Sequence, residues 1–251
     1  MSLIKKAARG GTTRAQVRRN EKKNERGVCR IQKCCPGENL SGRSGGQQVY
    51  KTVGCGSLVK GVPEWPRIKY AIITSNKVFQ EDFNAQKYRV EFRKSDSKVK
   101  TFEMNLAFSD PILQDLASGL TVIPLNSHSS IFRHGFFKKK CSVLKHSPFK
   151  VLNEFSNGVC CYMVGDDTIS NRSGSFGVKP HELTRDSSGQ YYLSNVSWPR
   201  FPLGAAILRW VNEEWSLVGV LNSDSGSPEY FQPVRLSSEK FKNLRSGKLI
   251  N

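Results

Sequence analysis

From residue 48 onward, apolar and polar residues alternate in short segments with a period of two. Residues 88–92 and 99–104 follow this alternation, as strands buried on one face do, and residues 70–74 form the continuous apolar run of a strand buried on both faces. The six strands predicted between residues 48 and 126 are 49–53, 54–59, 70–74, 88–92, 99–104 and 120–125. Their spacing is that of a small antiparallel barrel.

A second series of β-type segments follows a polar connector at residues 127–140. Its predicted strands are 141–144, 158–165, 191–193, 205–210, 215–221 and 230–236. Ser237 can cap a short amphipathic helix over 237–244, because Phe241 and Leu244 stand three residues apart on one face. We therefore expect an all-β protein with an N-terminal six-stranded antiparallel barrel at 48–126 and a second one at 141–251 that ends in a helix.

Residues 1–47 differ from the rest in charge. They hold 12 Lys and Arg against three Glu, a net of +9 out of +18 for the whole chain. Few large apolar residues lie among them, so burial cannot offset an ordering cost of about 1–2 kcal/mol per residue. We expect a basic, disordered arm. The residues predicted to attract a polyanion are Arg14, Arg18, Arg19, Lys22, Lys23 and Arg26 in the arm, and Lys138, Lys139 and Lys140 in the connector.

Three features of the sequence bear on the cellular compartment of the protein. The chain has no apolar stretch near the ~20 residues of a membrane span, and its first residues lack the apolar centre of a secretory signal. Seven cysteines, an odd number with two adjacent pairs, suit reduced thiols. We therefore predict an intracellular protein, cytoplasmic or nuclear, without contact to a membrane.

No cofactor is predicted. The sequence contains no Cys-x-x-Cys and no His-x-x-x-His, so the triplet Cys29, Cys34 and Cys35 is weak support for a metal site.

Four segments occur in the order and at the spacing of a known family. They are Gly54-Cys55-Gly56-Ser57-Leu58-Val59, then 71–78, then 120–125, then Leu203-Gly204-Ala205-Ala206-Ile207-Leu208 followed by 215–220. Together they resemble the chymotrypsin-like serine proteases of the PA clan over residues 48–251. The resemblance implies two barrels with a peptide-binding cleft between them.

The same resemblance assigns three positions to the catalytic triad. The histidine position is Lys77, which is protonated near pH 7 and cannot accept a proton from a serine. The aspartate position is Gly119 and the nucleophile position is Leu203, and neither carries a reactive group. The resemblance also places Val78 at the family's disulfide partner for Cys55. The chain is accordingly predicted to be an inactive serine protease homologue.

Such a homologue would act as a binding or regulatory module. The cleft of the family binds peptide by adding a strand to an exposed edge, which here corresponds to residues 217–222, and this mode needs no triad. A protein or peptide in the cleft is the partner implied.

Two other functions fit some of the residues. The second function is that of an active serine endopeptidase that uses Ser225 or an unrecognised dyad. Ser225 lies within Ser-Asp-Ser-Gly-Ser-Pro, which resembles the nucleophile signature of active family members. Only one strand and the terminal helix are predicted after it, so a polar hairpin loop is the favoured interpretation. The shifted acid Asp115 is expected to be exposed, and His128, His134, His146 and His181 are expected at the surface. The third function is non-specific nucleic-acid binding through residues 1–47, a stretch that also suits nuclear import.

Overall fold

A computed structural model provides the fold. It describes residues 27–35, 49–62, 65–79, 84–94, 100–106, 112–116, 118–125, 150–151, 160–166, 176–185, 187–188, 191–194, 203–211, 214–222, 229–233 and 242–243. Within these ranges the chain forms mostly antiparallel strands, and its only helical elements are single 3₁₀ turns. The predicted all-β class is confirmed at this level. None of the helical turns in the described part has the length and apolar character needed to cross a membrane.

The first sheet contains eight strands. Their order across the sheet is β15 (Lys242–Asn243), β6 (Leu113–Asp115), β7 (Leu120–Pro124), β3 (Trp65–Ser75), β2 (Val49–Val62), β1 (Val28–Cys35), β4 (Tyr88–Lys94) and β5 (Lys100–Asn105). All neighbours pair antiparallel. Strands β3 and β4 cover the predicted segments 70–74 and 88–92, and β5 and β7 cover most of 99–104 and 120–125. The segments 49–53 and 54–59 were predicted as two strands, but they belong to the single strand β2.

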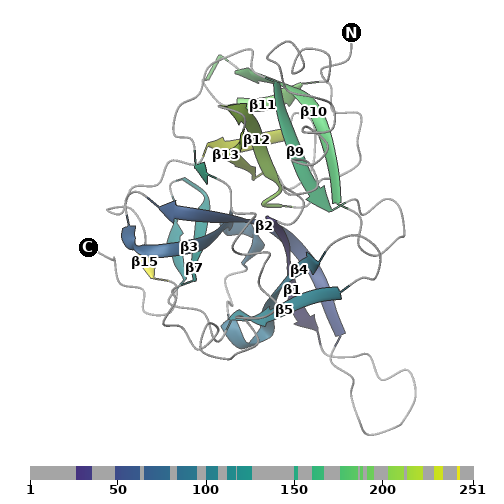
Figure 1. Cartoon of the computed structure of the whole chain (residues 1–251), viewed down its shortest axis with the longest axis vertical. Coiled ribbons are helices and arrows are strands. Elements are labelled where there is room, and N and C mark those ends of the chain that lie inside the picture. Colours follow the sequence, from purple (N-terminus) through teal and green to yellow (C-terminus); the bar gives the residue numbers. More distant parts are fainter. Residues whose placement is uncertain are drawn as a thin grey trace, which may run out of the picture.

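The second sheet contains seven strands. It lies above the first sheet in the view of Figure 1, with strands coloured from green to yellow. Its order is β12 (Ala206–Val211), β9 (Cys160–Asp166), β10 (Phe176–Arg185), β11 (Tyr191–Ser194), β14 (Glu229–Pro233), β13 (Glu214–Leu221) and β8 (Lys150–Val151). Strand β12 also pairs with β13, so the six strands β12, β9, β10, β11, β14 and β13 pair in a closed ring. The short β8 adds to β13 in parallel.

One predicted boundary is wrong, because residues 28–35 are not part of a disordered arm. They form β1, which lies between β2 and β4 in the first sheet. Val28, Cys29 and Ile31 are fully buried. The sequence does not reveal this strand, because it lies next to a highly charged segment and one of its core positions, Cys29, is a cysteine packed as a small apolar residue. The rest of residues 1–47 lies outside the described ranges, as does the connector 127–140.

The predicted C-terminal helix over 237–244 is not confirmed. Of that segment the structure describes Lys242 and Asn243, which form β15 instead. They pair with Gln114 and Leu113 at the outer edge of β6. The backbone groups of that edge strand need hydrogen-bond partners, and a two-residue strand supplies them better than a helix would.

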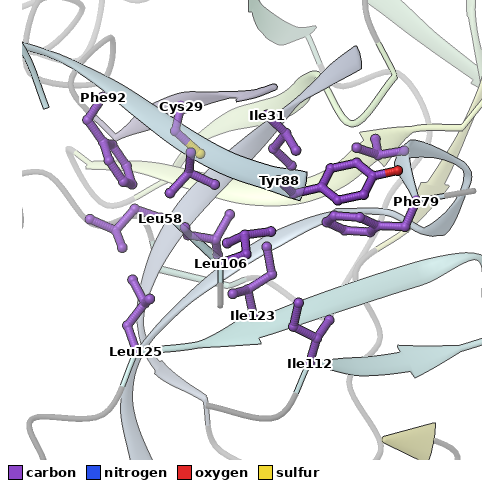
Figure 2. Close-up of a cluster of buried hydrophobic side chains, with 13 residues drawn as sticks. Cys29, Ile31, Leu58, Phe79, Tyr88, Phe92, Leu106, Ile112, Ile123 and Leu125 are labelled. Carbon is purple, nitrogen blue, oxygen red and sulfur yellow. The ribbon is translucent and has the colours of Figure 1, made fainter. Parts of the chain in front are cut away.

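The core of the first sheet is a cluster of apolar side chains (Figure 2). Strands β1, β2, β3, β4 and β7 all contribute to it, and the η2 turn (Asn76–Val78) adds Val78. Phe79 meets Tyr88 edge to face, with ring centroids 5.3 Å apart. Because β4 and β7 are far apart in the strand order yet share this cluster, the sheet curls around a single core.

The buried thiol of Cys29 should be unreactive in the folded protein. Burial raises the pKa of Cys29 well above its ordinary value, and the nearby Cys55 raises it further. In contrast, Cys34 and Cys35 are only half-buried. We expect iodoacetamide to modify these two first, with Cys29 modified only after denaturant is added, as peptide mass spectrometry can measure. Equal rates of iodoacetamide modification at Cys29 and Cys34 in the folded protein would contradict this prediction.

The same burial should make the stability of the protein depend on pH. The thiol of Cys29 ionises above about pH 8.5 in the unfolded chain, while in the folded protein it keeps its proton. The free energy of unfolding should therefore fall as the pH rises above this value.

Candidate functional site

A backbone hydrogen bond from Asn76 holds the η2 turn, which contains Lys77, next to Gly119. Strand β3 ends at Ser75, whose hydroxyl caps the η2 turn by accepting from the Lys77 N–H at 3.2 Å. The Asn76 N–H donates to the Gly119 carbonyl at 2.9 Å, and Gly119 immediately precedes β7. Two segments more than 40 residues apart in the sequence therefore meet where β3 ends and β7 begins.

Leu203 reaches the same region from the second sheet. Its carbonyl accepts from the Cys55 N–H at 2.7 Å, which joins the start of β12 to the middle of β2. Gly54 permits this approach, because a Cβ on residue 54 would lie 2.5 Å from Val78 Cγ2 and 2.8 Å from the Leu203 oxygen. We call the strand ends gathered here the junction: residues 54–55, 74–78, 119, 203–204 and 221–222. Strands β2 and β3 contact β12 and β13 around it.

An asparagine fills the space beside Gly119. The Ser75 hydroxyl donates to Asn222 Oδ1, 147 residues away along the chain. A Cβ on Gly119 would lie 2.5 Å from Asn222 Nδ2, and the backbone of Gly119 has φ of +68°. The amide of Asn222 thus occupies the place into which a side chain at position 119 would project, and glycine suits both the backbone conformation and the contact.

Lys77, Gly119 and Leu203 differ in exposure, and none of them carries a nucleophilic hydroxyl or thiol. Lys77 is exposed, and Leu203 is half-buried against the core cluster. Gly119 has no side chain. An ammonium and a hydrocarbon can bind or pack against a ligand, but neither can take a proton from a hydroxyl or attack a carbonyl at neutral pH.

The hydroxyl groups of the junction are buried structural groups. Thr74 Oγ1 donates to the Cys55 carbonyl at 2.6 Å, and both Thr74 and Ser75 are fully buried. A nucleophile must be reached by its substrate, so neither hydroxyl substitutes for a catalytic serine. Ser75 and Asn222 are absent from the residues predicted for the site. A serine directly after a strand and before a turn is a capping signal, but nothing local in the sequence indicates that its partner is Asn222.

Two sequence expectations near the junction are wrong. Asp115, expected to be exposed, is 3% exposed at the end of β6, opposite Leu120. Residues 217–222 were expected to offer a strand edge to a peptide. Instead, β13 pairs with β12 on one side and with β8 and β14 on the other. Backbone pairing within the second sheet therefore uses both edges of β13.

Several predicted residues lie outside the described ranges. These are Ser225, His128, His134, His146, the arm cations Arg14, Arg18, Arg19, Lys22, Lys23 and Arg26, and the connector cations Lys138, Lys139 and Lys140. His181 belongs to β10, where it pairs with Cys161. In the described part of the chain, no three His, Cys, Asp or Glu residues are grouped as metal ligands would be.

Comparison with known proteins adds no identification. Neither a protein-family model nor a curated protein matches the sequence.

Proposed function

We propose that this chain is a non-catalytic homologue of the trypsin-like serine proteases that acts as an intracellular binding or regulatory module. The observation that carries the proposal is the meeting of the η2 turn, Gly119 and Leu203 at the junction. Three positions assigned by motif order alone need not lie near one another in an unrelated fold. Their convergence supports the alignment, and their side chains support the loss of catalysis.

The strand pairings support a two-barrel architecture of the trypsin type. In the second sheet, six strands pair in a ring that closes through β12 and β13. In the first sheet, β7-β3-β2-β1-β4-β5 is a run of six strands around one core cluster. On our proposal this run closes into the first barrel at the part of β7 that β6 leaves uncovered, because β6 pairs with residues 120–122. On this proposal β1 belongs to the first barrel, and the barrel begins near residue 28 instead of 48.

The proposed partner of the module is a protein or peptide held at the junction surface. Lys77 supplies an exposed cation there, and Leu203 replaces a polar nucleophile by a hydrocarbon. Because β13 is paired along both edges, the partner contacts side chains at Lys77 and Leu203 and does not extend the sheet along residues 217–221. Buried thiols such as Cys29 and Cys55 suit the intracellular location that we propose.

An activity-based probe tests the loss of catalysis. We expect a fluorophosphonate, which reacts with the activated serine of serine hydrolases, to leave the native chain unlabelled. Intact-protein mass spectrometry would detect the adduct, with an active trypsin as the positive control. The matched variant is Ser225→Ala, and like the wild type it should show no adduct. Labelling of the wild type that disappears in Ser225→Ala would overturn the proposal and establish the active-protease alternative.

A further inference from the structure

We propose that Asn222 is a latch through which the second sheet controls the order of the η2 turn, and with it the position of Lys77. Asn222 immediately follows β13 of the second sheet, whereas the η2 turn immediately follows β3 of the first. The latch consists of Asn222, Ser75 and Gly119. Its use by a partner that binds at Lys77 rests on the proposed function, but the existence of the latch does not.

The η2 turn depends on two hydrogen-bond acceptors outside itself. A helical turn begins with backbone N–H groups that have no acceptor within the turn. In η2 the Asn76 N–H donates to the Gly119 carbonyl at 2.9 Å. The next N–H, that of Lys77, donates to Ser75 Oγ at 3.2 Å. A three-residue turn is too short to be stable by itself, so these two acceptors hold it in place.

Asn222 contacts both acceptors. Its Oδ1 accepts from the Ser75 hydroxyl, so the oxygen that receives the Lys77 N–H is itself held by the second sheet. Its amide lies against Gly119, where an added Cβ would be 2.5 Å from Asn222 Nδ2. Ser75 is fully buried, so removal of the Asn222 amide would take away the acceptor of a buried hydroxyl. The order of the turn should therefore depend on Asn222.

The second sheet fixes the position of Asn222. Leu221, directly before it, accepts from the Gly204 N–H at 2.8 Å through its carbonyl. A separate backbone bond, from the Cys55 N–H to the Leu203 carbonyl at 2.7 Å, joins the second sheet to the first. Release of the latch would therefore loosen the η2 turn while this bond still joins the sheets.

Coupling between the second sheet and the turn must act in both directions. Lys77 is exposed, so a ligand can reach it. A ligand that binds only the ordered turn would favour the bonded latch, and the bonded latch would favour that ligand by the same factor. The order of the turn is measurable in the chain without any partner. A failure of the latch is therefore distinguishable from a failure of the proposed function.

Residue-resolved hydrogen exchange of the full-length chain, followed by NMR, tests the latch. We expect Asn222→Ala to raise the exchange rates of the backbone amides of Asn76 and Lys77 by about tenfold, because loss of the hydrogen bond makes local opening more frequent. Asn222→Asp keeps an oxygen that can accept from the Ser75 hydroxyl, and should hold these rates within about threefold of the wild type. Wild-type rates for both amides in Asn222→Ala would overturn the proposal.

Two further variants separate the latch from a general loss of stability. Val90 of β4 is fully buried in the core cluster, two strands from β2, so Val90→Ala lowers stability without touching the junction. It should change the exchange rate of the Lys77 amide by less than about twofold. Ser75→Ala removes the hydroxyl between Lys77 and Asn222, and adding Asn222→Ala should have little further effect on that rate. The proposal fails if Val90→Ala accelerates exchange as much as Asn222→Ala, or if the effects of the two junction variants multiply.

Discussion

Replacing Gly204 by alanine is expected to destabilise the folded protein by about 3–4 kcal/mol. Gly204 has φ of +77°, a conformation that alanine adopts only with strain. A Cβ at this position would collide with the Cys55 carbonyl oxygen and with Thr74 Oγ1. These two atoms are hydrogen-bonded to each other in the buried junction, so neither can move without breaking that bond. Denaturant unfolding of the purified variant measures the loss.

Gly119 provides the comparison for this prediction. Its φ is similar, at +68°, but the three atoms nearest to an added Cβ all belong to the side-chain amide of Asn222. A side chain can rotate where a backbone carbonyl cannot, so Gly119→Ala should cost less than Gly204→Ala. The cost of Gly119→Ala should also fall when Asn222→Ala is present, as a double-mutant cycle would show. If Gly204→Ala unfolds at the same denaturant concentration as the wild type, the packing of the junction described above is incorrect.

Truncating Ile31 to alanine is expected to cost about 3 kcal/mol of stability. Ile31 lies in β1 and is fully buried in the core cluster beside Tyr88 and Leu58 (Figure 2). The change removes three buried carbon atoms and leaves a cavity among side chains that belong to several strands. The shift of the unfolding midpoint in denaturant measures the effect, provided that the slope of the transition is unchanged.

The neighbouring strand offers a matched control. Thr52 of β2 is exposed and pairs with Gln32 of β1, and Thr52→Ala should change stability by less than about 0.5 kcal/mol. If Ile31→Ala were equally mild, residues 28–35 would be dispensable, as the prediction of a disordered arm requires. A large loss would instead mean that a chain shortened to begin at residue 48 lacks a core strand.

How far the sequence predicts this fold depends on the length and the context of each strand. The continuous apolar run at 70–74 and the alternation at 88–92 identify β3 and β4, because burial on two faces or one face dictates those patterns locally. The strands β6 and β8 have three and two residues, too short for a period to be visible. Strand β1 does not alternate, because its buried positions are residues 28, 29, 31 and 32, and it follows a highly charged segment.

The sequence likewise predicts some features of the candidate site but not others. The motifs single out Lys77, Gly119 and Leu203, and the residue types by themselves argue against proton transfer at these positions. The motifs do not indicate that Asn222 occupies the space beside Gly119, or that Ser75 bonds to it. Those two residues are 147 positions apart, and their contact follows from how the ends of β3 and β13 are brought together.

The amino-acid sequence by itself determined the β class of this protein, many of the longer strands and the residue types at positions 77, 119 and 203. These are local properties, set by the spacing of apolar residues and by the chemistry of single side chains. Only the tertiary structure decided that residues 28–35 form a core strand, that Gly119 and Gly204 take positive φ, and that both edges of β13 are paired. Each of those outcomes depends on which distant segments bury one another, and that choice is made by the packing of the whole chain.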